Sequence, residues 1–274
     1  MIRSRTGTLS KLSIERCCRA IGISRAAFYK PRKAVSLEEL NRVEMIRTLH
    51  SQSWTSAFGY RRVSSELGLS VKRTRSLMRR HSLKGRCWRK SRGCTRSVSV
   101  PGATNLMPHL DHSQPSRIFA GDVTELQLRS GSKAYLCSLM DVCTRQILGY
   151  NVGLRNDTHL TLGALNMLVA SRNLGKLWIH HSDRGSNYAA DLYKQCIYDH
   201  NGLISYSDPG TPTQNAFAES FFSTFKLEQG KIFNNLQEAR IQIQDYILFY
   251  NTKRRHSSIG NKAPDTYYKE LALQ

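Results

Sequence analysis

The fold is decided by the segment "RIFAGDVTELQL" (residues 117–128), with "KAYLCSLMDVCT" (133–144) and "QILGYNVG" (146–153) after it. Each is a short apolar run, and short turns separate the three, the first turn being "RSGS". We therefore expect three consecutive strands that form a meander. Asp122 interrupts the first of these strands, which should be central in its sheet.

After the meander, helical and extended patterns alternate. The predicted elements are a helix at 157–173, a strand at 176–183, a helix at 187–201, a strand at 203–207, and helices at 214–228 and about 236–251. Three meandering strands followed by alternating helices and strands predict an α/β fold, with a mixed sheet flanked by helices.

The helix predicted at 214–228 carries an acidic residue on its polar side. At 100° per residue, Phe217, Phe221 and Phe225 share one face, which is typical of a buried stripe. Glu219 lies on the opposite face. Most glutamates on such a face only contact water, so this stretch alone favours no chemical role.

Two aspartates stand where apolar strands are interrupted or end. Asp122 lies inside the first strand, and Asp183 ends "KLWIHHSD" (176–183). Ligands collect at strand ends in such sheets. A capping or turn role explains each aspartate equally well when it is considered alone. Asp141 is a rival that also ends a strand, although the "CTR" after it indicates a turn.

Considered together, Asp122, Asp183 and Glu219 form a candidate catalytic and metal-binding set. Carboxylate oxygens are the ligands that Mg²⁺ prefers, and these three could hold two Mg²⁺ (or Mn²⁺) ions. Two such ions about 4 Å apart clamp the attacking and leaving oxygens of an in-line phosphoryl transfer. His180 and His181 precede Asp183, and the spacing leaves open which of them is buried and which assists.

Positive charge is concentrated in the first hundred residues. Residues 1–100 hold 24 Lys and Arg against 5 Asp and Glu, whereas residues 101–274 hold 17 against 15. Two helix-turn-helix patterns, at about 12–33 and 58–85, lie in the basic part, and a basic arm covers 84–100.

This distribution predicts three parts: a basic helical DNA-binding region at 1–100, a linker at 101–116 and a catalytic core at 117–274. In the first part, the side chains expected to contact DNA are Arg61, Arg62, Lys72, Arg73, Arg75, Arg79, Arg80, Lys84, Arg86, Arg89 and Lys90.

Several classes of protein are disfavoured by the composition. No run approaches the ~20 apolar residues that span a bilayer, and "MIRSRTGTLSKLSIERCC" lacks the apolar core of a secretory signal. The seven cysteines are odd in number and form no CxxC pair. We expect a cytoplasmic protein with reduced thiols, without a disulfide framework or a zinc cluster.

Four stretches resemble a known family: "FAGDVTEL", "HHSDRGSNY", "NAFAESFFSTFKLE" and "FYNTKRRHSSIGNKAPDTYY". They are similar to the second-frame (OrfB) transposase of bacterial insertion sequences of the IS-three type, and "FGYRRVSSEL" is similar to its helix-turn-helix segment. The 35 residues between Asp183 and Glu219 are the spacing typical of that family. Two positions depart from its pattern, because Phe119 replaces a common tryptophan and Gln214 replaces a common aspartate.

The resemblance implies a DDE catalytic core with a ribonuclease-H-like fold, related to retroviral integrases. It implies that Asp122, Asp183 and Glu219 are the acidic triad and that Lys226 lies near DNA. The implied reaction is hydrolysis at the ends of an insertion sequence, followed by strand transfer from the freed 3′-OH. The implied partners are terminal inverted repeats, target DNA, further copies of the chain, and a first-frame (OrfA) protein or a fusion with it.

Two other functions stay open at this point. A catalytically inactive DNA-binding protein derived from a transposase would need the helix-turn-helix region without the triad. A nuclease without joining activity would use the same metals, and a strand-transfer assay separates it from a transposase.

Overall fold

The structure is a computed structural model that describes residues 13–20, 22–29, 35–86, 100, 102–172, 174–175, 177–208 and 211–273. Its contacts divide the chain into two compact units, Met1–Glu44 and Met45–Gln274. The predicted division into a region at 1–100, a linker and a core stays a prediction.

The first unit is helical. It contains α1 (Ile14–Ala20), α2 (Arg25–Tyr29) and the beginning of α3 (Leu37–Ser51), which continues into the second unit. Gly22 has a φ of 68°, a left-handed conformation that glycine adopts without strain, and it makes the turn between α1 and α2. The described part of the pattern predicted at 12–33 is therefore helical on both sides of its glycine turn.

The second unit begins with a helical part. Its helices are the end of α3, α4 (Tyr60–Leu67) and α5 (Val71–Arg80). Gly68 ends α4 with a φ of 62°, and its backbone N–H donates to the carbonyl of Ser64. Val63, Leu77 and Met78 are buried. The two helices and the glycine turn predicted at 58–85 are present.

The rest of the second unit is built on one mixed sheet. Its strands are β1 (Ile118–Leu128), β2 (Lys133–Asp141), β3 (Ile147–Gly153), β4 (Trp178–Ser182) and β5 (Gly202–Tyr206), in the order β3-β2-β1-β4-β5. The first three strands pair antiparallel, whereas β4 runs parallel to both β1 and β5. A short strand that the sequence did not predict, β6 (Ile232–Phe233), pairs with the end of β1. The predicted meander is confirmed, and β1 is central.

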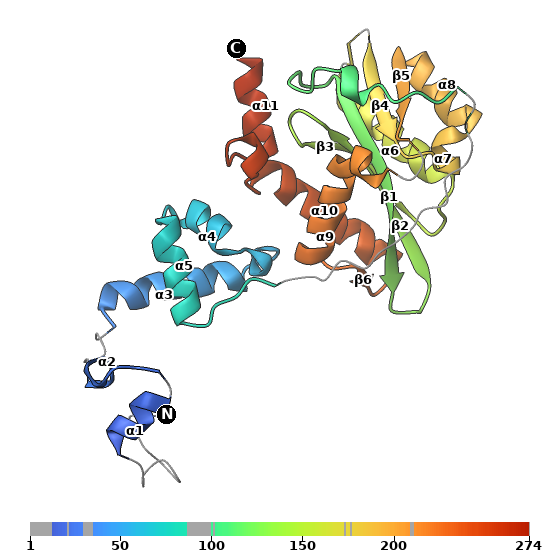
Figure 1. The fold of residues 1–274 in the computed structure, drawn as a ribbon. Coiled ribbons are helices and arrows are strands. Elements are labelled where there is room, and N and C mark those ends of the chain that lie inside the picture. Colours follow the sequence, from blue (N-terminus) through green and yellow to red (C-terminus); the bar gives the residue numbers. More distant parts are fainter. Residues whose placement is uncertain are drawn as a thin grey trace. The chain divides into compact units, whose positions relative to one another are not determined.

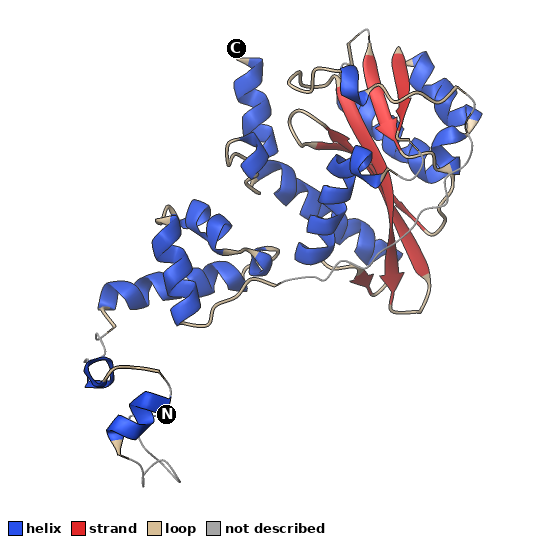
Figure 2. Ribbon diagram, in the orientation of Figure 1, coloured by secondary structure: helices blue, strands red, loops and turns tan. Residues whose placement is uncertain are grey.

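Helices cover both faces of this sheet (Figures 1 and 2). On one face lie α6 (Thr158–Ser171), α7 (Ser186–Ala189) and α8 (Asp191–Asp199). On the other lie α9 (Ala216–Glu228) and α10 (Leu236–Thr252), and α11 (Pro264–Ala272) contacts α10. This arrangement confirms the mixed α/β sheet flanked by helices, and its topology is the ribonuclease-H-like one that the resemblance implies.

Successive side chains of β1 point alternately toward the two layers of helices. Phe119 packs in the core with α6 and α8, whereas Leu126 and Leu128 pack in the core with α9 and α10. Successive strand residues point to opposite faces, so Asp122 shares the face of Leu126. The central strand therefore presents Asp122 to the α9 side of the sheet.

No helix in the described ranges combines the length and the apolar content that crossing a membrane requires. The described cysteines (Cys17, Cys18, Cys137, Cys143 and Cys196) are free thiols. Cys87 and Cys94 lie outside the described residues.

Candidate active site

The register between β1 and β4 brings two of the predicted carboxylates to neighbouring positions. Ile118 pairs with Ile179 and Ala120 pairs with His181. The pairing ends there: Asp122 stands two residues beyond Ala120 on β1, and Asp183 stands two residues beyond His181, directly after β4. Neighbouring strands lie about 4.8 Å apart, so the two aspartates follow adjacent ends of this pairing.

Asp183 also shapes the loop that follows β4. Its Oδ1 accepts a hydrogen bond of 3.0 Å from the backbone N–H of Gly185, which precedes α7. The side chain is partly buried, and this burial raises the pKa of Asp183, although the Gly185 N–H opposes the effect. The loop therefore fixes the carboxylate beside the sheet.

The third carboxylate depends on how α9 is anchored. Phe221 and Phe225 are buried as predicted, whereas Phe217 is only half-buried. At the start of α9, Asn215 Nδ2 donates a hydrogen bond of 3.0 Å to the carbonyl of Gly121. Glu219 follows one turn later on the exposed side of the helix.

The charges of the carboxylates and of Lys226 affect one another. Burial, together with the nearby charges of Asp183 and Glu219, raises the pKa of Asp122 to about 7. The Val123 backbone N–H, which donates to Asp122 Oδ1 at 2.7 Å, and Lys226 act in the opposite direction. Burial lowers the pKa of Lys226, and Asp122 partly offsets that effect. The structure thus brings Asp122 within electrostatic reach of Asp183, Glu219 and Lys226.

This donor set fits a divalent cation. Among the described side chains, no three His, Cys, Asp or Glu residues form a ready-made metal cluster. Asp122 nevertheless resists ionisation because it is buried and because the carboxylates of Asp183 and Glu219 lie nearby, whereas the positive charge of Lys226 opposes this effect. A hard cation would relieve that repulsion, and carboxylate oxygens are the ligands that Mg²⁺ takes.

Both histidines before Asp183 are buried parts of the fold. His181 Nε2 donates to the carbonyl of Gln214 at 3.2 Å, and its Nδ1 accepts from Ser205 Oγ at 2.8 Å. Nε2 of His180 lies 2.9 Å from the hydroxyl of Tyr193. Burial lowers the pKa of His180 to about 3 and that of His181 to about 4. His181 therefore holds the segment that leads into α9 against the sheet.

Gln214, the departure from the family pattern, belongs to that same segment. Its side chain accepts from the backbone N–H of Asp208 at 2.6 Å and donates to Asp208 Oδ2 at 2.9 Å. Arg184 contributes an ion pair of 3.7 Å to the same aspartate. Gln214 therefore links Asp208, which follows β5, to the segment that leads into α9.

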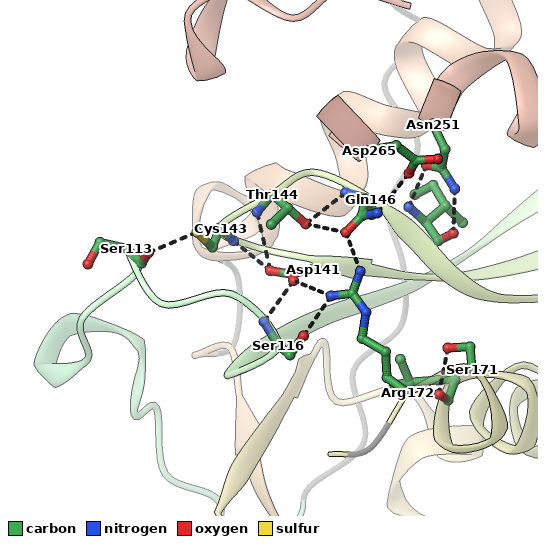
Figure 3. Close-up of polar contacts among 12 residues, drawn as sticks. Ser113, Ser116, Asp141, Cys143, Thr144, Gln146, Ser171, Arg172, Asn251 and Asp265 are labelled. Atoms are coloured by element: carbon green, nitrogen blue, oxygen red, sulfur yellow. Dashed lines mark hydrogen bonds and ion pairs between the residues drawn. The ribbon is translucent and has the colours of Figure 1, made fainter. Parts of the chain in front are cut away.

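Asp141 is a turn residue, as the sequence indicated (Figure 3). It is fully buried, and its carboxylate accepts from the backbone N–H groups of Ser116, Cys143 and Thr144. Arg172 lies 3.6 Å from the same carboxylate. These partners use the acceptor capacity of Asp141, and it takes no part in the site.

The predicted DNA contacts differ in their surroundings. Arg61, Lys84 and the five basic residues of α5 are exposed: Lys72, Arg73, Arg75, Arg79 and Arg80. Arg86 is also exposed, and it donates to Ser56 Oγ at 2.8 Å. Arg89 and Lys90 lie outside the described residues.

Arg62 has a structural contact that the sequence did not reveal. Its Nη1 donates at 3.0 Å to Glu228, whose buried carboxylate also pairs with Arg254 at 2.8 Å and accepts from the hydroxyl of Tyr246 at 3.0 Å. Glu228 is 3% exposed and Arg254 is 4% exposed. A single chain offers no signal for this cluster, because its members are far apart in sequence.

Comparisons with known proteins place the chain in a family. The integrase core domain family matches residues 112–212 and 202–264. The chain is 35% identical, over 93% of its length and 99% of the other, to the uncharacterized 31 kDa protein of insertion element IS600 from Shigella sonnei. It is 29% identical, over 94% of both chains, to transposase InsF for insertion sequence IS3A of Escherichia coli strain K12.

The chain belongs to the IS3-type transposases. It is thus a DDE-type DNA transposase, an enzyme that transfers polynucleotide strands, as the resemblance implied. Among solved structures, it is similar to the catalytic core domain of HTLV-2 integrase, with 14% identity and a TM-score of 0.42 over 56% of this chain and 97% of that one.

Proposed function

We propose that Asp122, Asp183 and Glu219 are the catalytic carboxylates of this transposase and that they hold two Mg²⁺ (or Mn²⁺) ions. The observation that carries the proposal is that Asp122 and Asp183 each lie two residues beyond the last β1–β4 pair, and that the charge of Asp183 acts on Asp122. The bond from Asn215 to the Gly121 carbonyl supports the place of Glu219, because it ties the start of α9 to the residue before Asp122.

The reaction has two steps at phosphorus. Water attacks a phosphodiester at the end of the insertion sequence and the 3′-oxygen leaves as a 3′-OH. That hydroxyl then attacks a phosphodiester of target DNA, forms a new bond and displaces the 3′-oxygen of the target strand. When bound, the two metal ions would activate the attacking oxygen and stabilise the leaving oxygen.

The residues of the chain orient the reactants. The buried stripe fixes the rotation of α9 and so keeps the charge of Glu219 within reach of Asp122, and Lys226 stands seven residues later on the same side of that helix as Glu219. We assign to Lys226 a contact with a DNA phosphate beside the scissile bond, because its charge is already within reach of Asp122.

The helical part of the chain supplies recognition in this proposal. The exposed basic side chains of α5 approach the terminal inverted repeat, where they contact phosphates and bases. The enzyme would act as a homo-oligomer that bridges two ends, together with a first-frame protein or as a fusion with it. It would work in the cytoplasm, at the nucleoid.

The test is metal-dependent cleavage and joining of a duplex that carries the terminal repeat of the insertion sequence encoding the chain. Wild type should give both products with Mg²⁺ or Mn²⁺, and Glu219→Gln should lower both rates by about a hundredfold or more. Glu125→Gln is the matched control, because Glu125 is an exposed glutamate on β1 that pairs with Lys133.

The rates of cleavage and joining distinguish the possible functions. Equal rates in wild type and Glu219→Gln would remove Glu219 from the site. Cleavage without joined product would make the chain a nuclease. If wild type binds the duplex but gives neither product, adding the first-frame protein distinguishes a missing partner from an inactive copy.

A further inference from the structure

A pocket lies beside α9, mostly on the part of the helix surface turned away from Glu219. Its volume is about 440 Å³, and its lining includes Arg145, Phe217, Ser220, Thr224, Arg254 and His256. At 100° per residue, the α9 residues that line the pocket lie about 60° to 160° around the helix from Glu219; they are Ala216, Phe217, Ser220, Phe221 and Thr224. The pocket therefore extends around α9 from the side of Glu219 toward the opposite side.

The cation of Arg145 is available to a ligand in this pocket. Its guanidinium carbon lies 4.3 Å from the ring centroid of Phe217, and its buried Nε has no hydrogen-bond partner among the described residues. Burial lowers the pKa of Arg145, and the charge of Asp141 is among the smaller opposing effects, so the site holds a cation that is partly removed from water and, among the described residues, makes no ion pair. A buried donor left in this way needs an acceptor.

The turn between β2 and β3 holds Arg145 in this position. Arg145 has a φ of 67°, the left-handed region that a side chain other than glycine adopts at some cost. Its backbone N–H donates to the carbonyl of Asp141 at 2.8 Å, within the hydrogen-bonded turn that the Asp141 carboxylate organises (Figure 3). The fold thus maintains a strained backbone where Arg145 enters the pocket.

The rest of the lining adds positive charge. Arg254 and Arg62 share the single carboxylate of Glu228, which leaves one cation in excess. His256 stays neutral, since burial and the three arginines Arg254, Arg62 and Arg145 lower its pKa to about 2. The hydroxyls of Ser220 and Thr224 line the same space and can donate hydrogen bonds. These groups together select an anion.

We propose that this pocket binds a backbone phosphate of the DNA strand that crosses α9 from the active site. The inference rests on the proposed function, which places the reacting strand at Glu219. The width of a helix with its side chains is about 10 Å, or roughly three nucleotides at 3.4 Å each along a strand. A guanidinium matches phosphate geometry with two parallel donors.

The first measurement is the salt dependence of binding by the full chain, with the terminal-repeat duplex and EDTA present. Each neutralised phosphate contributes about 0.9 to the slope of log K against log salt. Arg145→Gln should lower that slope by about this amount, and Arg145→Lys, which keeps the charge, should retain it. Arg129→Gln is the matched control, since Arg129 is exposed at the β1–β2 turn and outside the pocket.

The second measurement locates the phosphate. Duplexes with one neutral methylphosphonate are compared at each position near the cleaved bond. At one or two positions, the neutral group should weaken DNA binding by the wild-type protein several-fold. The same substitution should not change DNA binding by Arg145→Gln. Should Arg145→Gln not fold, Thr224→Asp gives the same comparison, because it places a negative charge in the pocket.

The outcomes separate the pocket from the catalytic site. Equal slopes and equal methylphosphonate profiles in wild type and Arg145→Gln overturn the inference, even if Glu219→Gln abolishes cleavage. The predicted changes in binding uphold it even if the Glu219 assignment fails. A third measurement is the effect of inorganic phosphate on Tm. If phosphate raises the Tm of wild type but not that of Arg145→Gln, and Arg145→Gln binds DNA as wild type does, the pocket binds a small free anion. That result would overturn the assignment to DNA.

Discussion

Asn215 Nδ2 donates a hydrogen bond of 3.0 Å to the carbonyl oxygen of Gly121, the residue before Asp122 in the central strand. Asn215 is 4% exposed, and it immediately precedes α9. This bond joins the helix that carries Glu219 to the strand that carries Asp122. The separation of the two carboxylates therefore depends on a residue that is itself neither acidic nor exposed.

Asn215→Ala should lower the rate of cleavage about 10- to 100-fold, which is the usual effect of losing a residue that orients a metal ligand. It should also cost about 1–3 kcal/mol of unfolding free energy, because the Gly121 carbonyl loses its buried donor. Binding of the terminal-repeat duplex in EDTA should stay at the wild-type level. Ser223→Ala, at an exposed position of α9, is the control. Wild-type cleavage by a folded Asn215→Ala protein would contradict this positioning role.

Asp122 should make the stability of the metal-free protein depend on pH. Its pKa in the folded state is raised to about 7, above the value of about 3.9 in an unfolded chain. The stability that the neutral carboxyl contributes is therefore present below about pH 4 and is lost as the pH rises through 7. Asp122→Asn should avoid that loss and have a higher Tm than wild type at pH 8 in EDTA.

At pH 5 the difference in Tm between Asp122→Asn and wild type should shrink. Adding Mg²⁺ or Mn²⁺ at pH 8 should raise the Tm of wild type more than that of Asp122→Asn, since a ligand that binds only the folded state stabilises it. Thermal unfolding at both pH values measures these differences. The same pH dependence of Tm in the two proteins would mean that neither burial nor the neighbouring carboxylates raise the pKa of Asp122.

The sequence predicted those parts of the fold that depend on local pattern. Three apolar runs and their turns sufficed for the meander, and Asp122 and Asp183 stood out because each broke or ended such a run. The bond from Asn215 to Gly121 could not be predicted, because it needs the register of β1 relative to a helix 94 residues away. The two-residue strand β6 is too short to have a pattern of its own.

Charged residues illustrate the same limit. Arg62 lies beside Arg61 in a basic segment, and sequence alone assigns both of them to DNA. In the fold Arg61 is exposed, whereas Arg62 reaches Glu228, 166 residues later in the chain. Only the tertiary structure distinguishes the two arginines, and the pocket around Arg145 was missed for the same reason.

Glu228→Gln should strongly destabilise the second unit. The Glu228 carboxylate is the shared partner of two guanidinium groups, and losing its charge leaves Arg254 buried without a counter-ion. Breaking a buried pair from one side costs about 3–5 kcal/mol of unfolding free energy. Urea unfolding measures it, with Glu125→Gln as control, because the exposed Glu125–Lys133 pair should contribute about 1 kcal/mol or less. Equal losses in the two variants would show that the buried cluster is not stabilising.

His256 should weaken the folded state as the pH falls. The residue is 9% exposed and its Nδ1 lies 3.1 Å from Nη1 of Arg254, and burial with the nearby arginines lowers its pKa to about 2. An unfolded histidine titrates near 6.5, so the stability due to neutral His256 is present above that pH and is lost below it. The loss is about 1.4 kcal/mol of unfolding free energy for each pH unit.

His256→Gln should remove the contribution of one titrating proton to the pH dependence of the unfolding free energy. Between pH 7.5 and 5.5, urea unfolding in EDTA should give a dependence of unfolding free energy on pH that differs from that of wild type by about 1.4 kcal/mol per unit below pH 6.5. Asp122, His180 and His181 are present in both proteins, so their own contributions cancel in this difference. Identical pH dependence in the two proteins would mean that His256 takes up its proton in the folded state, which would in turn require an anion in the pocket beside Arg145 to stabilise the added charge.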